Sequence, residues 1–212
     1  MRTLLLLPLV LALPAYAGTS AKQVVAPAPD PCITTWFAGA SVGYLTELEE
    51  PMYNVHVGVT NSCWMLAGWN VAFFGEVGYT DTSWAVNMMP FTDNNYTSRE
   101  EFDLTIMPIT VNVKFERNLT GNLNAYIGAG LGMAWIDGEF TAIRQIGGNV
   151  HETDSDWVFT TQIFAGLSYT VNPACEIYGG ARWIYLSDPI LGGSPFSVED
   201  DWLFELGARY KF

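Results

Sequence analysis

Four charged side chains stand on faces that otherwise carry small or neutral polar residues: Glu76, Arg182, Glu205 and Arg209. Carboxylates and guanidinium groups in such places form ion pairs, because a desolvated charge without a partner is costly. We therefore expect these four residues to form one network inside the fold. If the interior were an open pore, the same charges would set its ion selectivity.

Residues suited to hydrolytic or metal chemistry are sparse. The chain has two histidines, His56 and His151. Hydrolysis requires a nucleophile, a base and an orienting acid within reach of one another. His56 falls on a polar strand face without such partners, and His151 lies near Asp154 and Ser155 in a segment of unspecified geometry. We expect no catalytic residue, no metal site and no cofactor.

The elements that position these side chains are strands, because apolar residues recur at every second position. Eight segments keep this alternation: 36–44, 53–60, 69–80, 107–115, 124–135, 157–170, 176–185 and 202–212. If the last two segments pair with Tyr185 opposite Trp202, Arg182 falls opposite Glu205. The pattern predicts an all-β fold.

Composition decides what the apolar faces contact. Charged residues make up 15% of the chain, against about 25% in soluble domains, yet half of the chain is apolar. No run approaches the roughly 18 apolar residues of a membrane-spanning helix. We therefore predict an eight-stranded antiparallel up-and-down transmembrane β-barrel. A secreted β-sandwich or soluble barrel is the alternative.

Aromatic residues support the membrane interpretation, because they belong to the apolar phase and gather at both ends of the strands. One end has Trp36, Trp69, Phe115, Tyr169, Tyr210 and Phe212, and the other has Tyr44, Tyr53, Tyr79, Trp135, Trp157, Tyr185 and Trp202. Rings at both edges of an apolar band are typical of the two interfacial girdles of a membrane barrel.

The N-terminus predicts export. Residues 1–17 have a charged start, a short apolar run and an A-x-A site, which indicates a signal peptide cleaved after Ala17. Residues 18–33 form a periplasmic leader, and residues 34–212 form the barrel. The alternating length of the connections predicts short periplasmic turns and long extracellular loops, with long loops over 81–101, 137–156 and 187–201 and a first loop of intermediate length over 46–52. Both termini then lie in the periplasm.

One segment breaks the alternation. Leu104 and Ile106 are apolar at even positions, whereas the apolar residues are odd from Met107 onward, and Pro108 lies at the break. Proline cannot donate a hydrogen bond to a sheet. A β-bulge or a late strand start is expected there.

The sequence resembles the small outer-membrane β-barrel proteins of Gram-negative bacteria, such as the OmpA-type transmembrane domain, OmpX and related porin-family surface antigens. The resemblance rests on residues 36–44, 126–132, 179–183 and 204–212. It implies a non-enzymatic protein of the outer membrane. It also implies that Tyr210 and Phe212, in the closing aromatic strand, are the signal read by the barrel-assembly machinery.

Three cysteines, Cys32, Cys63 and Cys175, map to the periplasmic end. Cys32 lies four residues before Trp36 and Cys63 four residues after Val59, so antiparallel pairing of the first two segments places both at matching heights. A Cys32–Cys63 disulfide is therefore preferred, which leaves Cys175 over. Cys32–Cys175 is the competing bridge.

The predicted outer loops are strongly acidic. They hold 16 of the chain's 22 acidic residues: Glu47, Glu49, Glu50, Asp81, Asp93, Glu100, Glu101, Asp137, Glu139, Glu152, Asp154, Asp156, Asp188, Glu199, Asp200 and Asp201. Such a face repels nucleic acid and attracts cations or basic partners. Outer-membrane lipids and lipopolysaccharide are further expected partners, with divalent cations as bridges to lipopolysaccharide phosphates.

These observations favour a monomeric outer-membrane barrel with a structural or surface-interaction role. A small porin or gated narrow channel is the main alternative, although eight strands leave an interior that side chains can fill. A lipid A-modifying outer-membrane enzyme is a more remote alternative.

Overall fold

The computed structural model describes residues 32–88, 98–144, 150–191, 194–195 and 200–212. Among these residues every regular element is a strand, and none forms a helix capable of crossing a membrane. The predicted signal peptide lies outside the described residues, as does the leader except for Cys32 and Ile33.

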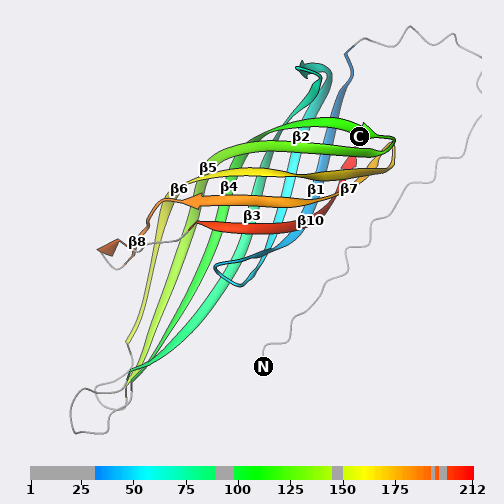
Figure 1. Cartoon of the computed structure of the whole chain (residues 1–212). Coiled ribbons are helices and arrows are strands. Elements are labelled where there is room, and N and C mark those ends of the chain that lie inside the picture. The colour runs from blue at the N-terminus through cyan, green and yellow to red at the C-terminus, as the bar shows by residue number, and fades with distance from the viewer. Residues whose placement is uncertain (1–31, 89–97, 145–149, 192–193, 196–199) are drawn as a thin grey trace, which may run out of the picture. The chain divides into compact units, whose positions relative to one another are not determined.

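Eight strands close into a ring in the order β1-β10-β7-β6-β5-β4-β3-β2, and every neighbouring pair is antiparallel. Their bounds are β1 Thr34–Leu45, β2 Pro51–Leu66, β3 Trp69–Met88, β4 Ser98–Thr120, β5 Leu123–Arg144, β6 Val150–Asn172, β7 Cys175–Leu186 and β10 Asp201–Lys211. The short strands β8 (Ile190–Leu191) and β9 (Ser194–Pro195) pair with each other outside the ring. The predicted eight-stranded up-and-down barrel is confirmed (Figure 1).

Apolar residues cover the outside of the barrel, and buried polar residues alternate with them on the inside of several strands. Val111 and Leu206 are 67% and 72% exposed on its outer surface, whereas the adjacent Asn112 and Glu205 are 1% and 5% exposed inside it. The predicted aromatic residues point outward with the apolar set, as in the facing pairs Tyr53–Tyr79 and Trp135–Trp157. This apolar exterior is suited to lipid.

The expectation of a bulge or late start at Pro108 is wrong. β4 keeps one register with β5 from Ser98 to Asn118, and its pairing with β3 has the same register on both sides of the proline. Leu104 and Ile106 lie inside the barrel, where they are 4% and 3% exposed. The alternation changes because this part of the lumen is itself apolar, so the strand needs no change of phase.

Two of the predicted long loops are mostly strand. β3 continues to Met88 and pairs with β4 from Ser98, while β5 continues to Arg144 and pairs with β6 from Val150. β3, β4, β5 and β6 therefore run past the end of the ring as a four-stranded extension (Figure 1). The outward positions of these strands are polar here, as at Asp81, Asp103 and Asp137, so the outward apolar residues that marked the eight segments stop before the strands do.

The opposite end has the predicted short turns. Two residues connect each of the pairs β2–β3, β4–β5 and β6–β7. In the first turn Ala67 and Gly68 both have positive φ angles, 51° and 82°. Two positive φ angles are the requirement of a type I′ hairpin, whose twist matches that of the flanking strands.

The disulfide joins Cys32 and Cys63, whose Cα atoms are 5.1 Å apart, and Cys175 is a free cysteine. Trp36 faces Val59 across β1 and β2, so the two cysteines lie at matching heights, as the residue counting predicted. The competing Cys32–Cys175 bridge is wrong.

Candidate functional site in the barrel lumen

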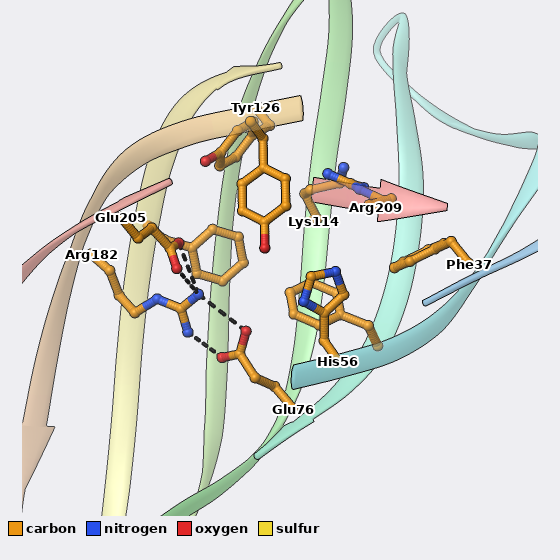
Figure 2. A pocket seen from close by; sticks show the side chains of 11 residues that line it. Phe37, His56, Glu76, Lys114, Tyr126, Arg182, Glu205 and Arg209 are labelled. Carbon is orange, nitrogen blue, oxygen red and sulfur yellow. Dashed lines mark hydrogen bonds and ion pairs between the residues drawn. The ribbon is translucent and has the colours of Figure 1, made fainter. Parts of the chain in front are cut away.

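The lumen contains an ion-pair network centred on Arg182 of β7. Its guanidinium binds both carboxylate oxygens of Glu76 from β3, with Nη2 3.1 Å from Oε2. Nη2 also donates to Glu205 of β10 at 2.9 Å and 3.2 Å. All three side chains are at least nine-tenths buried. Two carboxylates and one guanidinium leave this network with a formal excess of one negative charge (Figure 2).

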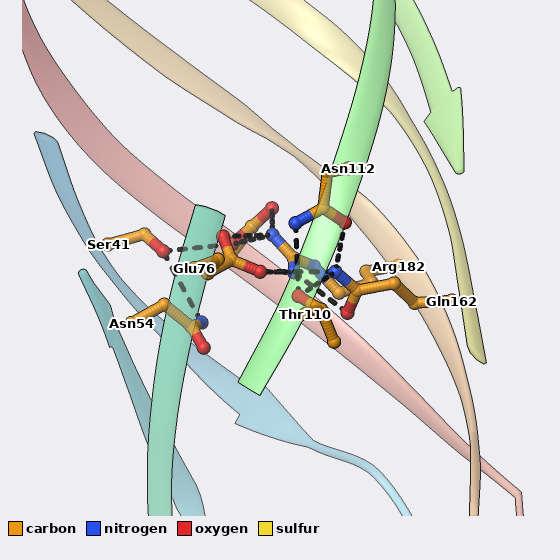
Figure 3. Close-up of polar contacts among 8 residues, drawn as sticks. Ser41, Asn54, Glu76, Thr110, Asn112, Gln162 and Arg182 are labelled. Atoms are coloured by element: carbon orange, nitrogen blue, oxygen red, sulfur yellow. Dashed lines mark hydrogen bonds and ion pairs between the residues drawn. The ribbon is translucent and has the colours of Figure 1, made fainter. Parts of the chain in front are cut away.

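Neutral polar residues extend this network around the barrel (Figure 3). Gln162 of β6 accepts a hydrogen bond from Arg182 at 3.0 Å and donates to Asn112 of β4 at 2.6 Å. Ser41 of β1 donates to Glu205 at 2.9 Å. These contacts satisfy charges that would otherwise be desolvated without partners, as buried ion pairs require.

The predicted register between the last two ring strands is wrong by two residues. Trp202 faces Trp183, so Arg182 faces Leu203 rather than Glu205. Arg182 reaches Glu205 diagonally. A shift of two residues keeps every side chain on its own face, so alternation in the sequence does not distinguish the two registers.

Arg209 does not join Glu76, Arg182 and Glu205; it belongs to a second row of charges nearer the short turns. In this turn-end row, cations and carboxylates alternate in the order Lys114, Glu116, Arg209, Glu176 and Lys211. Arg209 lies 3.3 Å from Glu176 and 3.9 Å from Glu116, and Lys211 lies 2.7 Å from Glu176. Glu176 lies on the predicted polar face of segment 176–185, and Glu116 lies one residue past the predicted segment 107–115, but neither was predicted to bind Arg209.

A layer of buried rings separates the two charged groups. It consists of Phe37, His56, Phe74, Tyr126, Phe164 and Tyr178, with ring centroids 5.5 to 6.4 Å apart. Along β7, Tyr178 lies between Arg182 and Glu176 in sequence. Glycines make room for this layer: a Cβ at Gly128 would lie 2.3 Å from the Phe164 ring. His56 thus lies among aromatic rings and faces Glu76 across β2 and β3.

The other end of the lumen is closed by an apolar cluster of inward side chains: Leu45, Met52, Leu104, Ile106, Ala134, Ile136, Val158, Ile184, Leu186 and Leu203. The β1–β2 connection folds against it. Asp201 accepts hydrogen bonds from the backbone N–H groups of Thr46, Glu47 and Leu48 at 2.8 to 3.0 Å, and Leu48 packs on the cluster.

The lumen has little open space at its centre. The hollow among the rings and the two charged groups has a volume of about 20 Å³. That is room for about one water molecule. The packed interior fits a closed barrel.

The candidates for hydrolytic chemistry do not converge. His151 Nδ1 lies 3.1 Å from Thr141 Oγ1 and 3.5 Å from Glu139, in an exposed part of the extension. Asp154 accepts a hydrogen bond from the backbone of Ser155. Among the residues that the structure describes, no group of three or more histidines, cysteines and acids is arranged to hold a metal ion.

The chain is similar to known proteins in its fold and not in its sequence. No family model and no curated protein sequence matches the chain. Neisserial surface protein A superimposes with a TM-score of 0.52 and 14% identity, covering 86% of this chain and 100% of that one. A major outer membrane protein from Thermus thermophilus gives a TM-score of 0.56 and 11% identity over 85% of this chain and 100% of the other. The chain therefore has the eight-stranded β-barrel fold of small outer-membrane proteins.

Proposed function

We propose that this protein is a non-enzymatic barrel of the Gram-negative outer membrane, in which a closed barrel anchors an acidic interaction surface. The filled lumen is the observation that carries the proposal. Apolar side chains, an ion-pair network and a ring layer succeed one another along it, and the central hollow of about 20 Å³ is too small for solute passage. A narrow gated channel would require the apolar cluster, the ion-pair network and the ring layer to open at the same time.

The proposed orientation places the short turns and both termini in the periplasm and the extension outside the cell. The asymmetry between two-residue turns and long strands past the ring supports this orientation, because outer-membrane barrels have short periplasmic turns. Tyr210 and Phe212 face outward at the turn end and are 51% and 67% exposed, which leaves them accessible to the assembly machinery. Within the ring every strand has two paired neighbours, so the barrel wall needs no second chain to complete its sheet, and in the part of the chain that the structure describes its unpaired edges lie on β3 and β6 in the extension.

The extension supplies the proposed interaction surface. Its outward register positions hold Asp81, Glu101, Asp103, Asp137 and Glu139. Asp103 and Glu139 face each other directly across β4 and β5. Like charges in that arrangement repel, and a cation or a basic partner relieves the repulsion. Lipopolysaccharide phosphates bridged by divalent cations are the proposed partner.

Conductance tests the closed anchor. The mature chain, refolded and inserted into planar bilayers, should show no steady single-channel steps. Regular steps would support the channel alternative instead. An epitope inserted between residues 146 and 147 should be reached by antibody on intact cells, whereas a tag after Phe212 should not be; the reverse result contradicts the orientation.

A charge-matched pair of variants tests the surface. Asp103→Asn with Glu139→Gln should weaken calcium-dependent binding to lipopolysaccharide vesicles several-fold. Asp188→Asn with Asp200→Asn removes the same charge from exposed positions outside the extension and should leave binding near that of the parent. Equal loss in both pairs would indicate general electrostatic attraction rather than this surface.

A further inference from the structure

The turn end of the barrel contains a recess of about 380 Å³. Its floor includes three cations, Lys114, Arg209 and Lys211, and one carboxylate, that of Glu116. Its rim carries neutral polar side chains: Thr35, Thr60, Asn61, Ser62 and Asn70. Cavities of this order hold small molecules in proteins, where a few polar groups fix the orientation of the ligand. The recess is thus large enough for more than an inorganic ion.

The turn-end row has one positive charge more than it has negative charges. Lys114, Arg209 and Lys211 face two carboxylates, those of Glu116 and Glu176, and both carboxylates are already shared between two cations. Two other charged groups at this end, Arg117 and the terminal carboxylate of Phe212, do not line the recess. The opposite excess of charge, on the Glu76–Arg182–Glu205 network, lies beyond the ring layer.

Aromatic rings partly compensate the positive charges of Lys114 and Arg209 and position these two side chains. The Arg209 guanidinium lies 5.1 Å from the centre of the Phe37 ring and 5.3 Å from that of Tyr178, and the Lys114 ammonium lies 5.6 Å from that of Tyr126. Arg209 Nε has no hydrogen-bond partner among the described residues, although the residue is only 7% exposed. A ring face attracts a cation without neutralising it. The recess therefore remains suited to an anion.

The rim of the recess is braced in advance. The backbone N–H of Ile33 donates to Ser62 Oγ at 2.8 Å, and the backbone N–H of Ser62 donates to the carbonyl of Ile33 at 3.0 Å, directly beside the Cys32–Cys63 disulfide. A preformed rim lowers the entropic cost of ordering a bound ligand.

We propose that this recess binds the carboxylate of a short peptide or another small organic acid. A single negative charge balances the single excess positive charge of the turn-end row, whereas a phosphate dianion would overcompensate it. Lys211 is the contact residue, because its side chain is 26% exposed whereas those of Lys114 and Arg209 are 5% and 6% exposed. With the orientation proposed above the ligand comes from the periplasm, but binding itself does not depend on that orientation.

Calorimetric titration of the mature chain in a non-ionic detergent tests the proposal. N-acetyl-alanyl-alanine should bind saturably with a dissociation constant of about 1 mM, the affinity expected of a ligand of this size. Its C-terminal amide should bind at least about tenfold more weakly, because a charge-assisted hydrogen bond is lost. Acetate, titrated in parallel, distinguishes recognition of the peptide from recognition of the bare carboxylate.

Three variants locate the site. Lys211→Gln should weaken binding about tenfold, and Glu116→Gln should strengthen it because the excess positive charge increases. Arg117→Gln, which removes the same charge from an exposed position outside the recess, should leave binding unchanged. Heat-modifiable gel mobility verifies the fold of each variant. Equal binding of acid and amide, equal effects of Lys211→Gln and Arg117→Gln, or no saturable binding would each overturn the proposal, and none of these results bears on conductance or on the acidic extension.

Discussion

The carboxylate of Glu76 on β3 and the guanidinium of Arg182 on β7 meet across the lumen, although 106 residues separate them along the chain. The contact uses both carboxylate oxygens, and the two side chains are each about 4% exposed. A bidentate contact of this kind fixes the distance between opposite walls of the barrel. It also makes each partner dependent on the other, because neither side chain is exposed to bulk solvent.

Removing one charge of this pair should destabilise the barrel strongly. Glu76→Gln should lower the free energy of unfolding by about 1.5 to 3 kcal/mol, because Arg182 loses a charge-assisted contact but keeps its pairing with Glu205. Arg182→Met should cost more, since it leaves the carboxylates of both Glu76 and Glu205 without their cation. Urea titration in lipid vesicles, followed by tryptophan fluorescence, measures both. A smaller effect for Arg182→Met than for Glu76→Gln would contradict the central place of the arginine.

Two leucines of β10 provide a matched test of the apolar cluster. Leu203 is 0% exposed inside the barrel, whereas Leu206 is 72% exposed outside it. Leu203→Ala should cost about 3 kcal/mol, because it leaves a cavity that the rigid wall cannot fill. Leu206→Ala should cost about half as much, since lipid replaces the missing atoms. The same urea titration compares them, and equal costs would mean that the cluster is loosely packed.

Asp201 should control the mobility of the β1–β2 connection. Asp201→Ala removes the acceptor of the Thr46, Glu47 and Leu48 amides, so hydrogen exchange at these amides should accelerate by at least about tenfold. Asp200→Ala is the control, because that neighbouring side chain is exposed. Unchanged exchange in Asp201→Ala would show that packing of Leu48 alone holds the connection.

The Cys32–Cys63 disulfide should stabilise the barrel, because it closes a loop and so lowers the conformational entropy of the unfolded chain. Cys32 and Cys63 are 31 residues apart, and replacement of both by serine should lower the free energy of unfolding by about 3 to 4 kcal/mol in the chain-entropy description. Cys175→Ser should have little effect, since Cys175 is free. Non-reducing gels and urea titration report the two variants, and comparable losses in both would assign the effect to side-chain packing.

The sequence by itself determined the strands, their faces and the number in the ring. Residues such as Val111 and Asn112 could be assigned to opposite sides of the barrel wall, because successive side chains of a strand point to opposite faces. The two faces have different surroundings, so their residue types differ. The cysteine pairing could also be predicted from the sequence. Cys32 and Cys63 are equally far from Trp36 and Val59, which face each other in adjacent strands, so the two cysteines lie at the same height along the barrel.

Tertiary structure decided the contacts between strands and where the strands end. A shift of two residues is invisible to alternation, so only the closed ring shows that Arg182 faces Leu203. Arg209 was expected with Glu76 and Arg182, yet the ring layer and the ends of β4 and β7 direct it toward Glu116 and Glu176. The apolar cluster and the extension form from side chains and hydrogen bonds of several strands. The pattern of a single segment therefore does not predict them.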